Sequence, residues 1–268
     1  FVYRDHSRYF NDFSVSELAL VLRAFQDRYN DLKDDDCVEY ISVFHNHGSE
    51  AGASVSHPHS QLIGVPVIPP DVSRSILGSK KYFDEHQKCV HCTMLEWERT
   101  RKERVIFEND LFIAFCPYVS RTAFETRIFP KIHQPRFEMI TEEDRISAAG
   151  ALSAVLKKMS SALNNPPYNF FIHNINSIAL ESYFVSFLGV CPSKARARRI
   201  SKKEIFGPTI FLTGVRSTTF PSFKSAFIAS SIFKKCAREI SYFKYSVLTC
   251  DSSSISFSIC VMIVSTVI

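Results

Sequence analysis

Two segments of the chain carry apolar residues at the spacing of an α-helix. The first starts at Ser14, where Ser14 and Glu17 form a capping box that satisfies the free backbone N–H groups of a helix start. Its apolar positions share one face: Leu18, Val21, Leu22, Phe25 and Tyr29. The second starts at Thr141 and ends in the segment 164–167. Its apolar positions are Ile146, Leu152, Val155, Leu156 and Met159. Both patterns predict an amphipathic helix that covers a core.

Shorter apolar or alternating runs predict strands between and around these helices. They cover residues 1–4, 40–44, 103–107, 111–115, 126–130 and 168–173, and one further run ends in 62–65. Asn109 and Asp110 separate two of these runs and indicate a hairpin. The acidic residues 34–36 indicate an exposed loop. The chain thus mixes helices with short strands.

The order of the elements repeats along the chain. The helix starts Ser14 and Thr141 lie 127 positions apart, and each precedes a strand end by 32 positions, at Asn46 and at His173. The triplets 44–46 and 172–174 align with an offset of 128 instead. A period of this length indicates a duplicated domain, because solenoid repeats are much shorter.

The repeat also predicts that both copies are incomplete. An offset of 127 places the first-copy counterparts of Cys89 and Cys92 ahead of Phe1, so we expect a missing upstream segment. The same offset puts Phe184 and Ser186 at the places of His57 and His59. We therefore expect the second copy to lack a histidine-bearing strand.

Candidate catalytic residues are most concentrated in residues 44–70, which hold four of the nine histidines. His57, His59 and Gln61 alternate along an expected strand, so their side chains project from the same side. A turn of small residues precedes them, in which backbone N–H groups can approach an anion. It consists of Gly48, Gly52, Ala53 and Ser54. A neutral imidazole beside a phosphate site favours nucleophilic attack on phosphorus. The competing interpretation is a buried strand whose histidines have only structural hydrogen bonds.

A second motif, Cys89-x-x-Cys92, indicates a metal site. Two thiolates at this spacing suit tetrahedral zinc, and a distant histidine commonly completes the set. His133 is the candidate, because it precedes the second helix start by eight positions as His6 precedes the first. His91 is an alternative ligand. A redox role would need a strand-to-helix setting that the sequence does not indicate.

The net charge of +5 is unevenly distributed. Residues 1–173 hold 20 basic and 23 acidic residues, whereas residues 174–268 hold 12 basic and 4 acidic ones. The basic run 194–203 offers the sole argument for nucleic acid or a membrane surface, and the apolar end 256–268 is short for a membrane span. We therefore expect no nucleic-acid or membrane partner. The eight cysteines lack regular spacing, which favours a reducing, cytoplasmic location.

The motifs Asn46-x-Gly48, Gly52-Ala53-Ser54 and His57-Pro58-His59-Ser60-Gln61 together resemble the active site of galactose-1-phosphate uridylyltransferases. This family is the nucleotidyltransferase branch of the histidine-triad superfamily. The resemblance implies an α+β fold, with a histidine-triad-like antiparallel sheet and helices, built from two duplicated halves that are both incomplete here.

The resemblance also assigns roles to these residues. It implies that His59 is the nucleophile that becomes nucleotidylated, that Gln61 holds a phosphoryl oxygen and that His57 is a zinc ligand. Asn46, together with the turn residues Gly48, Gly52, Ala53 and Ser54, would contact the nucleotide phosphates.

The resemblance further implies two zinc sites. His6 and His57 would belong to the first, and Cys89, Cys92 and His133 to the second, whose fourth ligand would come from the absent histidine strand. It implies a homodimer that acts on a nucleotide sugar and a sugar 1-phosphate, with ADP-glucose phosphorylase activity as one alternative and an inactive zinc-binding fragment as another. We expect residues 1–75 to be the end of the first half, 76–173 the start of the second and 174–268 a tail outside the family.

Overall fold

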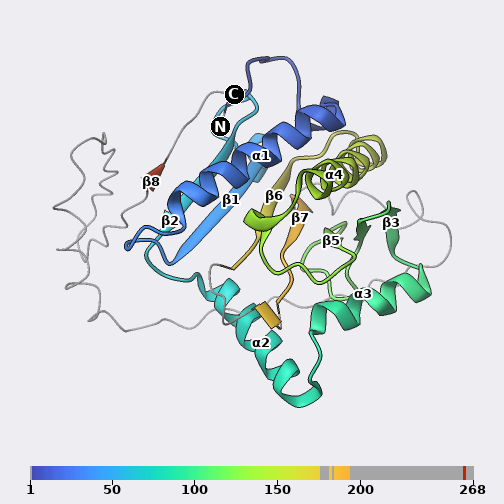
Figure 1. Ribbon diagram of the computed structural model, residues 1–268. Helices are drawn as coiled ribbons and strands as arrows, with labels where there is room; N and C mark the ends of the chain where they lie inside the picture. Colours follow the sequence, from blue (N-terminus) through green and yellow to red (C-terminus); the bar gives the residue numbers. More distant parts are fainter. Residues whose placement is uncertain (1, 176–180, 183, 194–261, 264–268) are drawn as a thin grey trace, which may run out of the picture. The chain divides into compact units, whose positions relative to one another are not determined.

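A computed structural model describes residues 2–175, 181–182, 184–193 and 262–263 of the chain (Figure 1). All of these belong to one compact unit of the chain, and a second unit, 206–260, lies outside the described residues. The predicted basic run 194–203 and most of the apolar end 256–268 also lie outside them. Within the described residues, none of the helices is long and apolar enough to cross a membrane.

Four α-helices and three short 3-10 helices occur in the described part of the chain. The α-helices are α1 (Val15–Leu32), α2 (Pro70–His86), α3 (Val90–Arg101) and α4 (Glu142–Leu163). The 3-10 helices are η1 (Phe10–Asp12), η2 (Ser49–Ala51) and η3 (Phe137–Met139). The capping boxes at Ser14 and Thr141 are both formed, and Asn164 ends α4 in the left-handed conformation. These limits of α1 and α4 confirm the sequence prediction.

Helices α2 and α3 were not predicted, because the sequence analysis assigned no helix or strand between the strand ending at 65 and the one starting at 103. Pro70 stands in the first turn of α2, where its missing N–H costs nothing. Only Val72 and Ser79 of α2 are buried, so no apolar stripe marked it in the sequence. Ile146 of α4 was assigned to the core face and is instead exposed.

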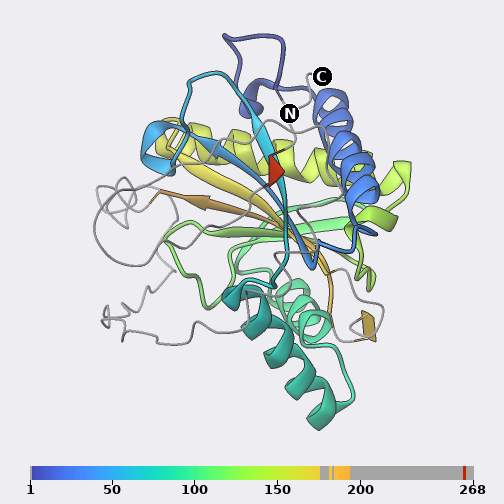
Figure 2. The same ribbon diagram turned by 90° about the vertical axis from the view of Figure 1, so that its left-hand side faces the viewer.

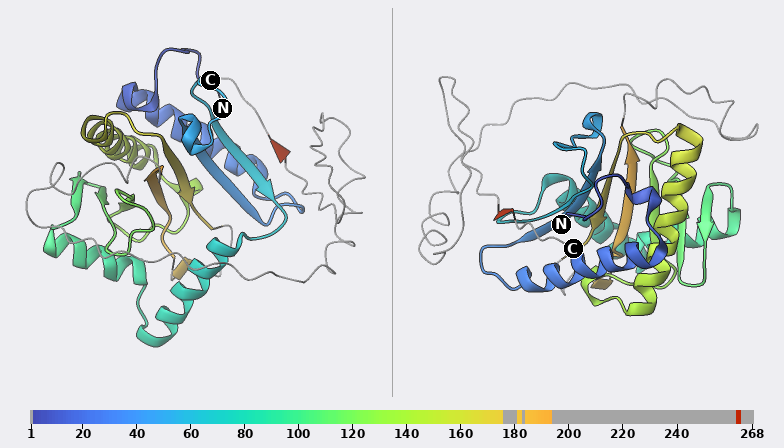
Figure 3. Two further views of the ribbon diagram at one scale, coloured as in Figure 1. Left: turned by 180° about the vertical axis from the view of Figure 1, so that it is seen from behind. Right: turned by 90° about the horizontal axis from the view of Figure 1, so that it is seen from above.

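The strands form one antiparallel sheet, shown from behind in Figure 3. They are β1 (Tyr40–His47), β2 (Ser60–Val65), β3 (Val105–Glu108), β4 (Phe112–Phe115), β5 (Thr126–Pro130), β6 (Tyr168–His173), β7 (Phe187–Pro192) and β8 (Met262–Ile263). Their order across the sheet is β3-β4-β5-β7-β6-β1-β2-β8. β5 and β6 have the predicted limits, whereas β1 extends to His47. The predicted α+β class with an antiparallel sheet is confirmed.

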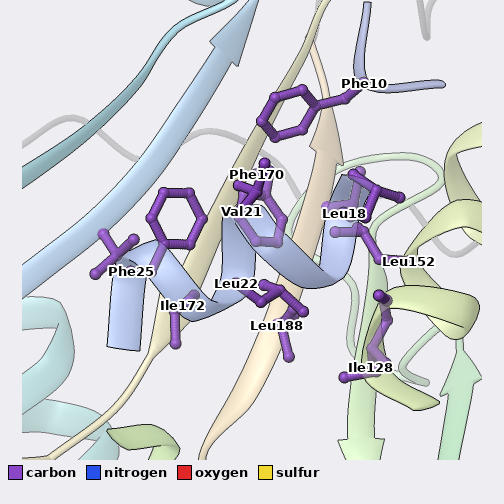
Figure 4. Packing of buried hydrophobic residues seen from close by; sticks show 14 of the residues in the cluster. Phe10, Leu18, Val21, Leu22, Phe25, Ile128, Leu152, Phe170, Ile172 and Leu188 are labelled. Carbon is purple, nitrogen blue, oxygen red and sulfur yellow. The ribbon is translucent and has the colours of Figure 1, made fainter. Parts of the chain in front are cut away.

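Side chains of the sheet alternate between two apolar layers. One layer packs against α1 and α4, and Figure 4 shows Leu22 of α1 beside Ile172 and Leu188 of the sheet. The other layer packs against α3, where Leu95 meets Phe129 and Phe187. Figure 2 shows these helices on opposite sides of the sheet. Both faces are therefore buried around the central strands.

The duplication is visible in the elements themselves. An offset of 127 carries η1 onto η3, the first residue of α1 onto the first residue of α4, and β2 onto β7. As expected, the described residues of the second copy include no histidine-bearing strand at this place. A strand is present at Phe187–Pro192, but it carries no histidine.

The structure also decides between the two offsets. His45 lies in the α1–α4 layer against Phe10, whereas His173 lies in the other layer beside Phe187. The two His-Asn pairs are therefore not equivalent, although their letters match. An offset of 127, which pairs His45 with Ile172, keeps every residue on its own face.

Candidate active site and metal centre

The end of β1 leads into a glycine-hinged turn. Gly48 and Gly52 have φ values of 81° and 90°, in the left-handed region that favours glycine. Between them the chain makes one turn of 3-10 helix, and the N–H groups of Ala51 and Ala53 both donate to the Gly48 carbonyl, each at 3.1 Å. Ser54, which follows, is exposed. The turn is thus a compact exposed loop, suited to the approach of an anion.

Asn46 connects this turn to the sheet. Its amide nitrogen donates to the Gly52 carbonyl at 3.4 Å. Its amide oxygen accepts from Asn169 of β6 at 2.8 Å, and the same Asn169 nitrogen donates to the Ala51 carbonyl at 2.7 Å. No sequence signal points to Asn169, because it belongs to no motif and lies in the second half.

His59 stands just before β2, where it forms an isolated bridge with Val2. Its Nδ1 atom lies 2.9 Å from the carbonyl oxygen of His57. A carbonyl oxygen only accepts, so Nδ1 carries the proton and Nε2 keeps the lone pair of the neutral ring. This is the tautomer that a nucleophilic imidazole requires.

Gln61 follows two residues after His59, on β2, and both side chains are half-buried. Because the strand alternates faces, these two side chains leave from the same side, as predicted. His57 does not share the strand, since β2 begins only at Ser60 and His57 lies in a bend before it. The bend nevertheless lets the His57 carbonyl reach the His59 ring.

His57 and His6, the two predicted ligands of a first metal site, lie against each other. Their rings are stacked with centroids 3.8 Å apart. The Nε2 atom of His57 contacts the Tyr3 carbonyl. No third cysteine, histidine or carboxylate of the described residues joins them closely enough to hold an ion. The structure therefore places the pair together but shows no complete ligand set there.

Two further histidines surround this site, and the sequence analysis assigned them no role. His45 is buried, stacks on Phe10 at 3.9 Å and lies 3.2 Å from the Ser60 hydroxyl. Burial lowers the pKa of His45 to about 3, so its ring is neutral near pH 7. His47 packs against the Tyr9 and Tyr168 rings, and burial lowers its pKa also. They fill the layer beneath β1 and β2.

The second predicted metal site is assembled in the structure. Cys89 caps the start of α3, Cys92 lies in its first turn and His133 follows β5. The Sγ and ring nitrogen atoms of the three residues all lie within 4.8 Å of one another. Two sulfur donors and one imidazole at this separation suit a tetrahedral ion such as zinc. Long-range folding thus brings together residues that are distant in the sequence.

Hydrogen bonds within this cluster shift the pKa values of its two thiols in opposite directions. The hydrogen bond from Cys92, then that from His133, holds the pKa of the Cys89 thiol below its ordinary range, whereas the hydrogen bond with Cys89 raises the pKa of Cys92. Nδ1 of His133 lies 3.2 Å from Cys92 Sγ, and its Nε2–H donates to the Glu181 carbonyl at 2.6 Å. A histidine held this way directs its Nδ1 lone pair at the cysteines, as metal ligands do.

A cavity of about 680 Å³ opens beside the cluster. Lys88, Glu96 and Glu181 line it together with the three candidate ligands. The site is therefore accessible from solvent.

The alternative ligand His91 points away from this cavity. It is buried against Phe129, Phe184 and Phe187, its Nε2 lies 3.4 Å from the Ser79 hydroxyl, and burial lowers its pKa to about 4. The position that corresponds to His57 is Phe184, which is fully buried and has no metal-binding atom. Among the described residues the metal cluster thus has three ligands.

Known proteins are similar to this chain in sequence and in fold. Residues 3–69 match the N-terminal domain of galactose-1-phosphate uridyl transferase. The chain is 36% identical over 190 residues to ADP-glucose phosphorylase of Arabidopsis thaliana, a match that covers 70% of this chain and 53% of the relative. It is 32% identical over 154 residues to galactose-1-phosphate uridylyltransferase of Thermotoga maritima, a match that covers 58% of this chain and 48% of the relative. The chain thus spans about half the length of these relatives.

Solved structures agree with the sequence matches. A crystal structure of an ADP-glucose phosphorylase from Arabidopsis thaliana with bound ADP-glucose superposes with a TM-score of 0.66 at 34% identity, over 70% of this chain and 60% of that one. A uridylyltransferase structure gives the same TM-score at 26% identity and the same coverage. The part of the chain that the structure describes is therefore related in sequence and fold to the galactose-1-phosphate uridylyltransferase family, and residues 3–69 match the N-terminal domain of that family.

Proposed function

We propose that the chain is a nucleotidyltransferase that moves a nucleoside monophosphate group through a covalent adduct on His59. The observation that carries this proposal is the hydrogen bond from His59 Nδ1 to the His57 carbonyl, 2.9 Å long, next to a glycine-hinged turn. In the neutral tautomer with the proton on Nδ1, the lone pair is on Nε2, and the hydrogen bond orients the ring. Both relatives named above carry nucleotidyl-transferring names.

In the first step, Nε2 of His59 attacks the α-phosphorus of a nucleoside diphosphate sugar. An N–P bond forms, the bond from that phosphorus to the bridging oxygen breaks, and the sugar 1-phosphate leaves with the electron pair. In the second step, a phosphate oxygen of an acceptor attacks the same phosphorus and the P–N bond breaks. The imidazole is thereby restored.

The other residues of the site stabilise charge on the phosphoryl oxygens. The turn at Gly52, Ala53 and Ser54 would lie against the anion. Its donor would be the Ser54 N–H, because the Gly52 and Ala53 N–H groups donate to the Ser49 and Gly48 carbonyls. The Gln61 amide would donate to an equatorial oxygen. Asn46 would contact the adjacent phosphate. These roles are proposals that follow from the position of the residues and from the family resemblance.

Zinc is proposed as the cofactor, because Cys89, Cys92 and His133 fit it in donor type and separation. A bound ion would fix the start of α3 to the end of β5 and so stabilise the sheet. Its role would be structural, while the imidazole performs the chemistry. His6 and His57 are proposed to belong to a second site of the same kind.

The donor nucleotide is either UDP-glucose, with galactose 1-phosphate as acceptor, or ADP-glucose, with inorganic phosphate as acceptor. The higher identity to ADP-glucose phosphorylase, 36% against 32%, favours the second reaction as the alternative to test. A homodimer, a cytoplasmic location and independence from nucleic acid and membranes stay predictions.

The decisive experiment incubates the purified chain with UDP-glucose and, separately, with ADP-glucose. Intact mass and peptide mapping then locate any adduct. We expect a uridylyl or adenylyl mass on His59 that His59→Ala abolishes, while the control His86→Ala, which removes an exposed imidazole on α2, retains it. A folded chain that gives no adduct with either sugar would instead be an inactive zinc-binding relative, the third candidate.

A further inference from the structure

The start of β6 supports the anion-binding turn of the first half from the side. In the register of the sheet, Asn169 lies directly opposite Asn46. Its two amide hydrogens serve two acceptors, the Asn46 side-chain oxygen at 2.8 Å and the Ala51 carbonyl at 2.7 Å. The Asn169 nitrogen is thus fully used, and both bonds cross between residues more than a hundred positions apart.

The first of these bonds decides which way the Asn46 amide faces. Because Asn169 donates to the Asn46 oxygen, the Asn46 NH₂ group must point to the turn, where it meets the Gly52 carbonyl at the long distance of 3.4 Å. A donor in that direction can bind a phosphate oxygen, whereas an amide oxygen there would repel it. The second bond fixes the carbonyl of the last residue of η2.

Pro167, two residues earlier, restrains the other end of the turn. A Cβ atom added to Gly48 would lie 2.9 Å from the Pro167 side chain. The backbone of the turn therefore rests directly on the proline ring. Pro167, just before β6, and Asn169 of β6 thus contact the turn at Gly48 and at Ala51.

We propose that Asn169 is a positioning residue for nucleotidyl transfer, and that it acts by holding the Asn46 amide with its NH₂ group toward the substrate phosphates. This inference rests on the proposed function, since it assigns the second half a task in the chemistry at His59. Asn169 itself does not touch the reacting atoms. It acts through Asn46 and through the Ala51 carbonyl.

Two substitutions separate positioning from simple support. Asn169→Leu removes both donors and leaves Asn46 free to rotate. Asn169→Asp keeps the shape but presents a carboxylate, which attracts the Asn46 NH₂ group and turns the amide over. We expect adduct formation on His59 to slow by about 10-fold in Asn169→Leu and by about 100-fold in Asn169→Asp. Lowering the pH toward about 5 protonates part of the introduced carboxylate and restores one donor, so Asn169→Asp recovers relative to wild type.

The matched control is Asn11→Ala. Asn11 also joins the two halves, by a hydrogen bond of 3.2 Å to Ser160 of α4, but it lies away from the turn. We expect it to lower the melting temperature without slowing adduct formation. If Asn11→Ala slows adduct formation as much as Asn169→Leu does, the slowing reflects lost stability, and Asn169 has no positioning role.

A second readout does not depend on activity. Glu50 is exposed at the centre of the turn, so a glutamate-specific protease can cleave the native chain there. We expect cleavage after Glu50 to accelerate several-fold in both Asn169 variants and to stay at the wild-type rate in Asn11→Ala, as followed by peptide mass.

The two readouts distinguish the possible failures. Accelerated cleavage in the Asn169 variants of a chain that forms no adduct even as wild type would reject the proposed function while keeping the support of the turn. Unchanged cleavage together with an unchanged adduct rate in Asn169→Asp would overturn the inference. Equal slowing in the Leu and Asp variants, with no recovery at low pH, would overturn it as well, because a flipped amide predicts a difference between them.

Discussion

Phe44 lies opposite Phe171 in the antiparallel register of β1 and β6, and the two residues are also each other's counterparts in the repeat. A pseudo-two-fold axis therefore passes between them. Two equivalent strands that pair antiparallel with a residue opposite its own counterpart are related by a two-fold rotation between these residues. The axis explains why α1 and α4 lie side by side, and why β2 and β7 flank the central pair.

The close approach of β7 to Phe171 predicts a sensitive glycine. A Cβ atom at Gly189, which pairs with Phe171, would lie 2.3 Å from the end of the Phe171 ring. We expect Gly189→Ala to lower the free energy of unfolding by about 1–3 kcal/mol, measured by urea denaturation. Gly78→Ala is the control, because that helical position has open space and should gain about 0.5–1 kcal/mol. Equal stability of both variants would contradict the packing described.

Gln26 ties α1 to the segment before α4. Its buried amide donates to the Glu138 and Ile140 carbonyls, both at 2.8 Å, and accepts from Arg145. Gln26→Leu leaves these groups without their partner, so we expect a loss of about 2–3 kcal/mol in the free energy of unfolding. Asp27→Ala, at the next and exposed position, should change it by less than about 0.5 kcal/mol. Thermal and urea unfolding of both variants would check this.

Metal binding should depend on the Cys89 cluster. We expect the purified chain to carry zinc, and Cys89→Ser to weaken zinc affinity by at least about 100-fold in competition with a chromophoric chelator. Cys116→Ser is the control, since Cys116 lies outside the cluster beside Thr126. A chelator should lower the melting temperature of the wild type and of the control. Full zinc affinity in Cys89→Ser would remove this site from the proposal.

Buried histidines should make the fold sensitive to acid. Burial lowers the pKa of His173 from 6.5 to about 3, so between these values the unfolded chain binds a proton that the folded chain does not. The contribution of His173 to the free energy of unfolding is therefore fully present above pH 6.5. It falls as the pH drops below 6.5, by about 1.4 kcal/mol per pH unit for one such group. His45, whose pKa is lowered to about 3, acts in the same direction.

The test compares the wild type with His173→Phe from about pH 7.5 to about pH 5. We expect the variant to lose less stability on acidification, by about one group's share. His86→Gln removes an exposed imidazole and serves as the control. An identical pH dependence in all three proteins would show that His173 does not carry this effect.

Local sequence patterns were sufficient to predict the helices with capping residues and the strand with regular alternation. The caps at Ser14 and Thr141 and the alternating strand 168–173 were predictable because each depends on neighbouring residues alone. α2 was not predictable, since it buries few side chains and so lacks an apolar stripe. β7 lies where the repeat would place it, but Phe184 and Ser186 stand before it at the positions of His57 and His59.

Part of the candidate site could likewise be predicted from the sequence, and part could not. The turn at Gly48 and the pair His57 and His59 could be recognised because their spacing is local. Asn169 could not, since its contacts with Asn46 and Ala51 depend on how two distant strands pair. The strand that was expected to include His57 begins only at Ser60. This difference is local as well, because the chain bends at His57, whose carbonyl accepts from the His59 ring.

Through the pairing of β1 with β6, the two halves of this one chain associate as two subunits of a dimer would, and the connection after β2 links them covalently. The connection after β2 includes the exposed residues Val67 and Ile68, so a cut there would separate the halves without entering either one. Each piece would then display an unpaired central edge that matches only the other. Separately produced pieces should consequently complement each other on mixing, and the nucleophile on one piece would regain Asn169 from the second.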